Sequence, residues 1–216
     1  LPDSPIVVWW PHSVPENPGE DSIGRIAQRR ITDSARAYDP MAVLTHLSEV
    51  YQAGDSDLAW TRLTLWRTQL AALLEQMPYS PVKRVVVWGS EKSPSVVLLG
   101  AWLGWKLEAE VHLATIGAAE RGLYRVAIER EDGQTIMFRP GKNIAIIETP
   151  YTPDQQIPLP VRTLADCISK ELRRLDPDTM YGEVLKSAFP TLEMHPAQCD
   201  AEPFLNTSEF PEVFDA

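Results

Sequence analysis

Tryptophan and arginine side chains are concentrated in residues 57–77, a segment whose spacing predicts an amphipathic helix. Trp60 and Arg67 fall two turns apart on one edge of the apolar stripe, and Arg62 falls on the opposite edge. Both residue types are enriched at the hot spots of protein interfaces, so Trp60, Arg62 and Arg67 are candidate partner-binding residues. We place Trp60 and Arg67 at this surface and Trp66 in the core. The stripe itself consists of residues that we expect to face the core: Leu63, Trp66, Leu70, Leu73, Leu74 and Met77.

Internal packing is the alternative explanation for the same segment. Leu58 and Leu65 face away from the stripe, where a surface helix should be polar. Apolar side chains usually indicate burial, so a second structural element would then cover that side. Both interpretations, docking surface and internal packing, stay open at this point.

Arg30 and Asp33 form a second candidate pair. Apolar residues at helical spacing predict a helix over residues 22–38, and Arg30 falls near the middle of its apolar face. A buried guanidinium requires partners, and Asp33, three residues further on, is the nearest. The pair is either an internal polar tie or a contact to a ligand or protein partner.

A turn rich in glycine and serine follows the predicted strand 82–88 and precedes a predicted apolar helix. This layout presents backbone N–H groups to an anion, which makes Gly89, Ser90 and Ser93 candidate anion-binding residues. The turn lacks the residues of a phosphate-binding P-loop and the glycine spacing of a dinucleotide-binding turn. Capping by Ser93, with Pro94 at the first helical position, explains the same residues and is the preferred interpretation.

No arrangement typical of an active site occurs in the sequence. A nucleophile elbow, a CxxC pair and a His-Glu-x-x-His motif are all absent. His195 and Cys199 have a spacing that allows a shared metal on a helix, but two ligands do not make a site. We therefore expect no catalytic residue, no metal and no cofactor, and interpret the chain as a non-enzyme.

Cys167 lies about a quarter-turn off the apolar face of a predicted helix and is expected to be a reachable thiol.

The composition argues against several classes of partner. The chain has 216 residues, 44% of them hydrophobic, and a formal net charge of −10. This charge argues against nucleic acid or an anionic membrane as the main partner. No apolar run reaches the roughly 18 residues that span a bilayer, and no signal peptide is visible. Two cysteines far apart suit a reducing compartment, so we expect a soluble, cytoplasmic protein. The first residue is Leu1 rather than Met, as expected of a fragment or a processed form.

The remaining patterns predict an α/β fold, with a mixed sheet of parallel core strands plus an antiparallel meander, flanked by amphipathic helices. We expect one domain over residues 1–189, with a linker at 149–160 and C-terminal helices at 161–189. An acidic, partly disordered tail is expected at 190–216. The predicted strands are 6–10, 82–88, 110–115, 124–129, 136–138 and 143–148, and the predicted helices are 22–38, 41–51, 57–77, 96–107 and 161–175.

Four segments resemble the OpcA family, the glucose-6-phosphate dehydrogenase assembly proteins of cyanobacteria and actinobacteria. They are Val8-Trp9-Trp10, Arg29-Arg-Ile-Thr-Asp-Ser34, Asp57-Leu-Ala-Trp-Thr-Arg-Leu-Thr-Leu-Trp-Arg67 and Leu98-Leu-Gly-Ala-Trp-Leu-Gly104. The resemblance covers roughly residues 1–150. Members of the family are usually longer, so the chain resembles the C-terminal part of a cyanobacterial member, without an N-terminal region.

The resemblance implies a non-catalytic allosteric activator. Such a protein binds glucose-6-phosphate dehydrogenase, promotes its active oligomer and raises its apparent affinity for glucose 6-phosphate in the oxidative pentose phosphate pathway. Cysteines are implicated in thioredoxin-linked control of cyanobacterial members, which here implies Cys167 and Cys199 as redox residues and thioredoxin as a second partner. Two other functions stay open: a sugar-phosphate-binding enzyme or sensor that uses residues 89–95, and a redox-responsive scaffold of broader specificity.

Overall fold

The computed structural model describes residues 4–76, 80–114, 122–150 and 152–197. Its larger sheet has seven strands in the order β10-β5-β4-β6-β7-β8-β9. The strands β10, β5 and β4 are parallel, whereas β6 to β9 form an antiparallel meander that joins the sheet at β4. This arrangement confirms the predicted α/β fold with a mixed sheet. The strands are β4 (Val82–Trp88), β5 (Glu110–Ala114), β6 (Arg125–Arg130), β7 (Gly133–Phe138), β8 (Ile144–Glu148), β9 (Gln155–Pro158) and β10 (Met194–Pro196).

A second, smaller sheet contains three parallel strands, β1 (Val7–Trp9), β2 (Arg29–Thr32) and β3 (Asp55–Asp57). The helix predicted over residues 22–38 is therefore wrong. The segment forms two 3₁₀ turns, η1 (Gly24–Ile26) and η2 (Ser34–Arg36), on either side of β2. Every residue of β2 is buried, so the alternation of polar and apolar residues that marks a strand is missing from the sequence.

The predicted buried strand over residues 6–10 is an edge strand. β1 pairs with β2 only, and Trp9 keeps 38% of its surface exposed. Large apolar residues are also exposed nearby along the chain, at Ile6, Ile23, Ile26 and Tyr38. The sequence pattern identified the strand but not the exposure of its apolar side chains.

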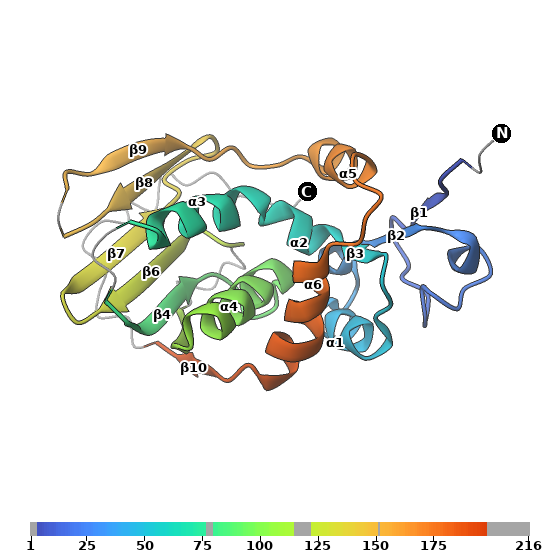
Figure 1. Ribbon diagram of the computed structural model, residues 1–216, viewed down its shortest axis with the longest axis horizontal. Coiled ribbons are helices and arrows are strands. Elements are labelled where there is room, and N and C mark those ends of the chain that lie inside the picture. The colour runs from blue at the N-terminus through green and yellow to red at the C-terminus, as the bar shows by residue number, and fades with distance from the viewer. Residues whose placement is uncertain (1–3, 77–79, 115–121, 151, 198–216) are drawn as a thin grey trace.

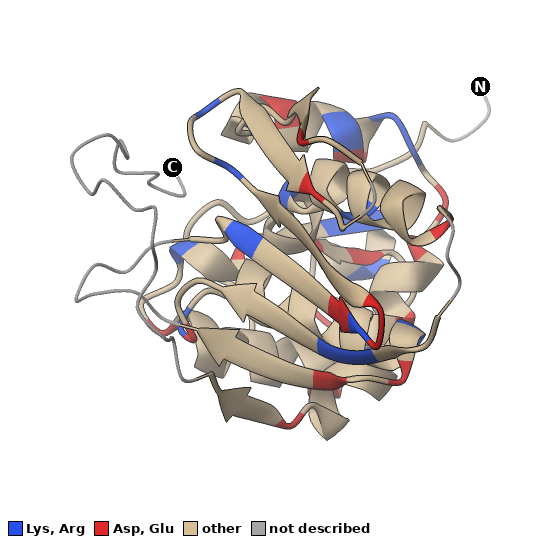
Figure 2. Cartoon of the chain, turned by 90° about the vertical axis from the view of Figure 1, so that its left-hand side faces the viewer, with Lys and Arg blue, Asp and Glu red and all other residues tan. Residues whose placement is uncertain are grey.

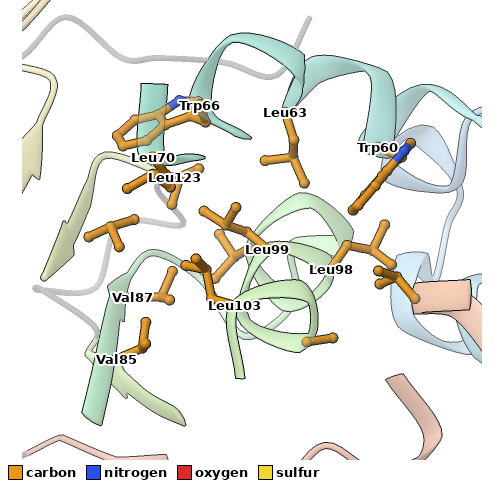
Figure 3. Packing of buried hydrophobic residues seen from close by; sticks show 14 of the residues in the cluster. Trp60, Leu63, Trp66, Leu70, Val85, Val87, Leu98, Leu99, Leu103 and Leu123 are labelled. Carbon is orange, nitrogen blue, oxygen red and sulfur yellow. The ribbon is translucent and has the colours of Figure 1, made fainter. Parts of the chain in front are cut away.

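Most helices lie between the two sheets, with the large sheet at the left of Figure 1 and the small sheet at the right. Helix α4 carries Leu98 and Leu99, which lie towards Trp60 and Leu63, and Leu103, which lies towards Val85 and Val87 of β4 (Figure 3). The helices are α1 (Pro40–Val50), α2 (Leu58–Arg62), α3 (Thr64–Leu74), α4 (Pro94–Leu107), α5 (Leu164–Leu172) and α6 (Thr179–Glu183), followed by the π-helical turn η3 (Val184–Ala188) and the 3₁₀ turn η4 (Phe189–Thr191).

The single helix predicted over residues 57–77 is divided into α2 and α3, which meet at Leu63. The predicted apolar stripe is otherwise observed, since Leu63, Trp66 and Leu70 are buried in the main core; residue 77 lies outside the described part. The opposite side of α2 is covered, because Leu58 is buried in a cluster with Ile31 and Cys167. Internal packing therefore explains Leu58.

Two expectations about the C-terminal third need correction. The predicted linker at 149–160 contains β9, the outermost strand of the meander, and prolines are tolerated there because an edge strand leaves N–H positions unpaired. The predicted tail at 190–216 begins with η4 and β10, and β10 pairs in parallel with β5. Residues 198–216 lie outside the described part of the chain.

The charged residues show no segregation by sign on the side of the molecule seen in Figure 2, where basic and acidic positions are interspersed. Among the described residues, no helix combines the length and the apolarity needed to cross a membrane.

Candidate functional site

The candidate residue Arg30 is buried in the small sheet and pairs with Asp55. Its Nη2 donates to the carbonyl of Ala53 at 2.7 Å and its Nη1 to that of Ala27 at 3.2 Å. The expectation that Asp33 would be its partner is wrong. Residues three apart on an extended chain point to opposite faces, whereas Arg30 and Asp55 are direct neighbours in the register of β2 and β3.

Asp33 instead binds Arg62. The two Nη atoms of Arg62 donate to the two carboxylate oxygens at 2.7 and 2.8 Å, a bidentate arrangement. The side chains are 1% exposed for Asp33 and 8% for Arg62, so the pair lies inside the protein. It joins the end of β2 to α2, 29 residues further along the chain.

Asp57 organises the same region. Its carboxylate accepts hydrogen bonds from Thr32 Oγ1 at 2.7 Å, from Ser34 N and Oγ at 2.9 Å each, and from Ala59 N at 2.9 Å. The last bond caps α2. Burial raises the pKa of Asp57, the neighbouring Asp33 raises it further, and the hydrogen bonds from Thr32, Ala59 and Ser34 oppose the rise.

Sequence reasoning missed Arg29. This buried arginine forms an ion pair with Glu171 of α5 and donates to the carbonyls of Arg174 and Asp176 at 2.9 Å each. Glu171 also accepts from Thr61 Oγ1 at 2.6 Å. The contacts cross more than 100 residues of sequence and tie β2, α2 and the end of α5 together, so no local pattern predicts them.

The contacts of Glu171 with Arg29 and Thr61 lie at the border of a cleft of about 440 Å³ between α3, α5 and α6. Trp60 is 2% exposed, and its indole Nε1 donates to Asp178 at 3.0 Å. The guanidinium carbon of Arg67 lies 3.7 Å from the centre of the Trp60 ring. The predicted proximity of Trp60 and Arg67 is observed, but Trp60 itself is buried rather than at the surface. The cleft is lined by Trp60, Thr61, Thr64, Arg67, Thr68, Trp102, Lys170, Glu171, Arg174, Asp178, Thr179 and Met180.

Arg67 is an incompletely satisfied charge of the cleft. Its Nε is buried and has no hydrogen-bond partner among the described residues. Burial lowers the pKa of Arg67 to about 10, while the carboxylates of Asp178 and Glu171 act in the opposite direction. At neutral pH the guanidinium is still charged, so the cleft holds a cation that is partly removed from water.

The turn at residues 89–95 provides only a weak indication of ligand binding. Ser93 is the N-cap residue of α4, but its side chain makes no capping hydrogen bond, and Ser93 Oγ has no partner among the described residues. Capping by this side chain is therefore not observed, although Pro94 does begin the helix. Ser90 Oγ accepts from Lys92 N at 3.1 Å. A Cβ at Gly89 would lie 2.5 Å from Val96 Cγ2, so close packing requires this glycine without any ligand.

The prediction that Cys167 is a reachable thiol is wrong. Its side chain is 0% exposed and packs beside Ile31 and Leu58. Burial raises its pKa, which further reduces its reactivity at neutral pH. The helix is rotated from the predicted orientation: Cys167 faces inward, whereas Leu172 is exposed. Cys199 lies outside the described residues.

His195 of β10 lies opposite His112 of β5, with ring centres 5.3 Å apart. Within the described residues, no group of three or more His, Cys, Asp or Glu side chains is placed to hold a metal ion.

Two family models match the chain. One describes the C-terminal domain of a glucose-6-phosphate dehydrogenase subunit and matches residues 53–185. The other describes the N-terminal domain of such a subunit and matches residues 1–49. The chain therefore contains sequence that resembles both parts of the family. No curated protein matches the sequence.

The likeness to solved structures is weak. KijD10, a 3-ketoreductase from Actinomadura kijaniata in complex with TDP-benzene and NADP, is 10% identical with a TM-score of 0.45, over 82% of this chain and 74% of that chain. The UDP-N-acetylglucosamine 3-dehydrogenase GnnA from Acidithiobacillus ferrooxidans is 8% identical with a TM-score of 0.29, over 83% and 76%. Likenesses of this strength carry no argument about activity.

Proposed function

The chain belongs to the OpcA family of glucose-6-phosphate dehydrogenase subunits, and we propose that it is a non-catalytic subunit that binds the dehydrogenase and favours its active oligomer. The observation that carries this proposal is that the C-terminal-domain model of the family matches the segment that contains the cleft. Every residue that lines the cleft lies within residues 53–185, the segment that the C-terminal-domain model matches.

We place the contact with the dehydrogenase on the face that contains the cleft, with Arg67 as its central residue. Arginine and tryptophan dominate binding energies at protein interfaces when they occupy desolvated positions. Arg67 is such a residue, because its guanidinium is partly removed from water and lies over the Trp60 ring. Trp60 is buried and holds the Arg67 guanidinium in place through the ring contact.

Arg30, Asp33 and Arg62 have an indirect part in this proposal. Their ion pairs are buried, so these side chains do not reach a partner directly. Asp33 and Arg62 instead fix α2, which carries Trp60, against the small sheet, and Arg30 joins β2 to β3 within that sheet. Breaking them would therefore affect binding by displacing α2.

A protein of this kind activates an enzyme by binding its active oligomer more tightly than its inactive form. A tenfold preference corresponds to about 1.4 kcal/mol. Through that preference the chain raises the apparent affinity of the dehydrogenase for glucose 6-phosphate, and it acts in the cytoplasm together with the enzyme. Control of this step by thioredoxin through Cys167 would require local opening of α5, because the thiol is buried.

The first experiment is co-elution of the chain with glucose-6-phosphate dehydrogenase from the same organism on a sizing column. We expect a stable complex that elutes at the size of the active oligomer. We also expect faster turnover at subsaturating glucose 6-phosphate when the chain is added. A folded chain that neither co-elutes nor changes the apparent KM would contradict the proposal.

Two variants distinguish a residue that contacts the dehydrogenase from a residue that stabilises the fold. Trp66→Ala removes a large side chain that is 2% exposed and should cost about 3–5 kcal/mol of unfolding free energy. Arg67→Ala should leave the chain folded, yet weaken co-elution and activation at least tenfold. Arg84→Ala, which removes an exposed arginine paired with Glu129 on the sheet, is the matched control and should bind normally. Equal loss of stability in the Arg67 and Trp66 variants would show that Arg67 is a packing residue.

A further inference from the structure

The cleft between α3, α5 and α6 has more positive charge than its own carboxylates neutralise. Among the described residues, the side chains of Arg67, Lys170 and Arg174 form no ion pair or hydrogen bond. Both acidic residues that line the cleft are already engaged. Glu171 binds Arg29 and Thr61, and Asp178 accepts from the Trp60 indole at 3.0 Å and from Tyr181 N at 3.1 Å.

Arg67 is held in a geometry suited to an oxyanion. Its guanidinium carbon lies 3.7 Å from the centre of the Trp60 ring, so the aromatic ring covers one side of the group. Arg67 lines the cleft, and its N–H donors have no acceptor among the described residues, including Nε, which is itself buried. A rigid donor edge of this kind matches the oxygens of a phosphate or carboxylate.

The size of the cleft is that of a small-molecule site rather than of a single side chain. Its volume of about 440 Å³ falls within the ~300–1,000 Å³ of typical ligand pockets. Trp102 and Met180 contribute apolar surface to the wall, and Thr179 contributes a hydroxyl. Such a wall accommodates an organic group next to the cationic residues.

We propose that this cleft binds a small organic phosphate monoester, with its phosphate at Arg67, Lys170 and Arg174 and its organic part against Trp102 and Met180. A phosphate monoester has close to two negative charges at pH 7 and three strong acceptor oxygens, so it neutralises several cations where a single carboxylate does not. The formal net charge of the chain is −10, so the cationic side chains of the cleft contrast with the overall charge of the protein. This site goes beyond the proposed function, because the isolated chain is sufficient to bind the ligand.

The test is isothermal titration calorimetry of the isolated full chain with glycerol 3-phosphate, with inorganic phosphate and with acetate, in a buffer free of phosphate. We expect saturable one-to-one binding of glycerol 3-phosphate, weaker binding of inorganic phosphate, and at least tenfold weaker binding of acetate. Binding should also weaken as the pH falls from 7.5 to 5.5, because the second phosphate pKa is about 6 and the dianion is lost.

Matched variants assign the binding to the cleft. Arg67→Gln should weaken glycerol 3-phosphate binding at least tenfold, whereas Arg84→Gln, an exposed arginine outside the cleft, should stay within twofold. If Arg67→Gln fails to fold, the double variant Lys170→Gln with Arg174→Gln decides, because both side chains line the cleft without bonded partners among the described residues.

Three results would overturn the proposal. The first is the absence of saturable glycerol 3-phosphate binding up to about 10 mM. The second is binding that neither Arg67→Gln nor the double variant changes, and the third is acetate binding as tight as phosphate binding. The last result would indicate a carboxylate ligand instead, such as an acidic side chain of a protein partner. Because no dehydrogenase is present, failure here leaves the co-elution result unaffected.

Discussion

Three buried ion pairs join different parts of this molecule. Asp33 with Arg62, Arg30 with Asp55 and Arg29 with Glu171 are ion pairs whose partners come from different elements. Removing one member of a buried pair leaves an uncompensated charge away from water, which costs far more than the pair itself contributes.

We expect Asp33→Ala to lower the free energy of unfolding by about 3–5 kcal/mol, because the largely buried Arg62 would lose both hydrogen bonds to this carboxylate. Urea denaturation followed by tryptophan fluorescence measures the loss. Glu129→Ala is the control, since it removes the carboxylate from the exposed Arg84 pair and should cost about 0–1 kcal/mol. Similar losses in both variants would show that the Asp33 pair is no more important than a surface contact.

Among the helices, α5 connects the small sheet to the cleft. Its inner face places Cys167 against Ile31 and Leu58, and its last turns bring Glu171 to Arg29. A capping box at Thr163 and Asp166 begins the helix, with Thr163 Oγ1 accepting from Asp166 N at 3.2 Å. The position of α5 therefore determines both the thiol environment and one wall of the cleft.

A Cys199→Ser variant leaves Cys167 as the only thiol in the chain. In the native state we expect this thiol to react with a thiol reagent at least 100-fold more slowly than in urea, because it is fully buried and burial raises its pKa. The measurement is the labelling rate by absorbance at neutral pH. Rapid labelling of the native chain would show that α5 opens readily and would restore a redox role for Cys167.

Across the molecule as a whole, one apolar core joins the helices to the large sheet. It contains Leu44 of α1, Trp60 of α2, Val85 of β4, Met137 of β7 and Tyr181 of α6. The pair of Asp33 with Arg62 attaches the small sheet to α2, and the pair of Arg29 with Glu171 attaches it to α5. Such shared packing favours cooperative unfolding.

We therefore expect the chain to unfold in urea as one domain, in a single transition. Far-UV circular dichroism and tryptophan fluorescence should give coincident curves, because tryptophans occur in both sheets and in the helices between them. Two separate transitions would contradict the prediction of one domain over residues 1–189.

Local patterns were sufficient for several elements that pack in or beside the main core. The apolar run before Gly89, the apolar helix after Pro94 and the alternating meander with its turn near Gly133 are all observed close to their predicted positions. The same patterns failed at β2, whose residues are buried on every side, and at β9, whose prolines suggested a linker. Hydrophobic periodicity reports one buried face and becomes ambiguous when all faces or none are buried.

The order of residue types was enough to predict the α/β class, the helices and strands around the main core, and the closeness of Trp60 to Arg67, which share one helical edge. The pairing of the buried charges depends on the tertiary fold instead. Arg30 pairs with Asp55 because parallel strands place them side by side, and Glu171 reaches Arg29 because α5 folds back across the chain. Strand register and helix docking bring together residues that are far apart in sequence, and a period of 2 or 3.6 residues contains no information about such partners.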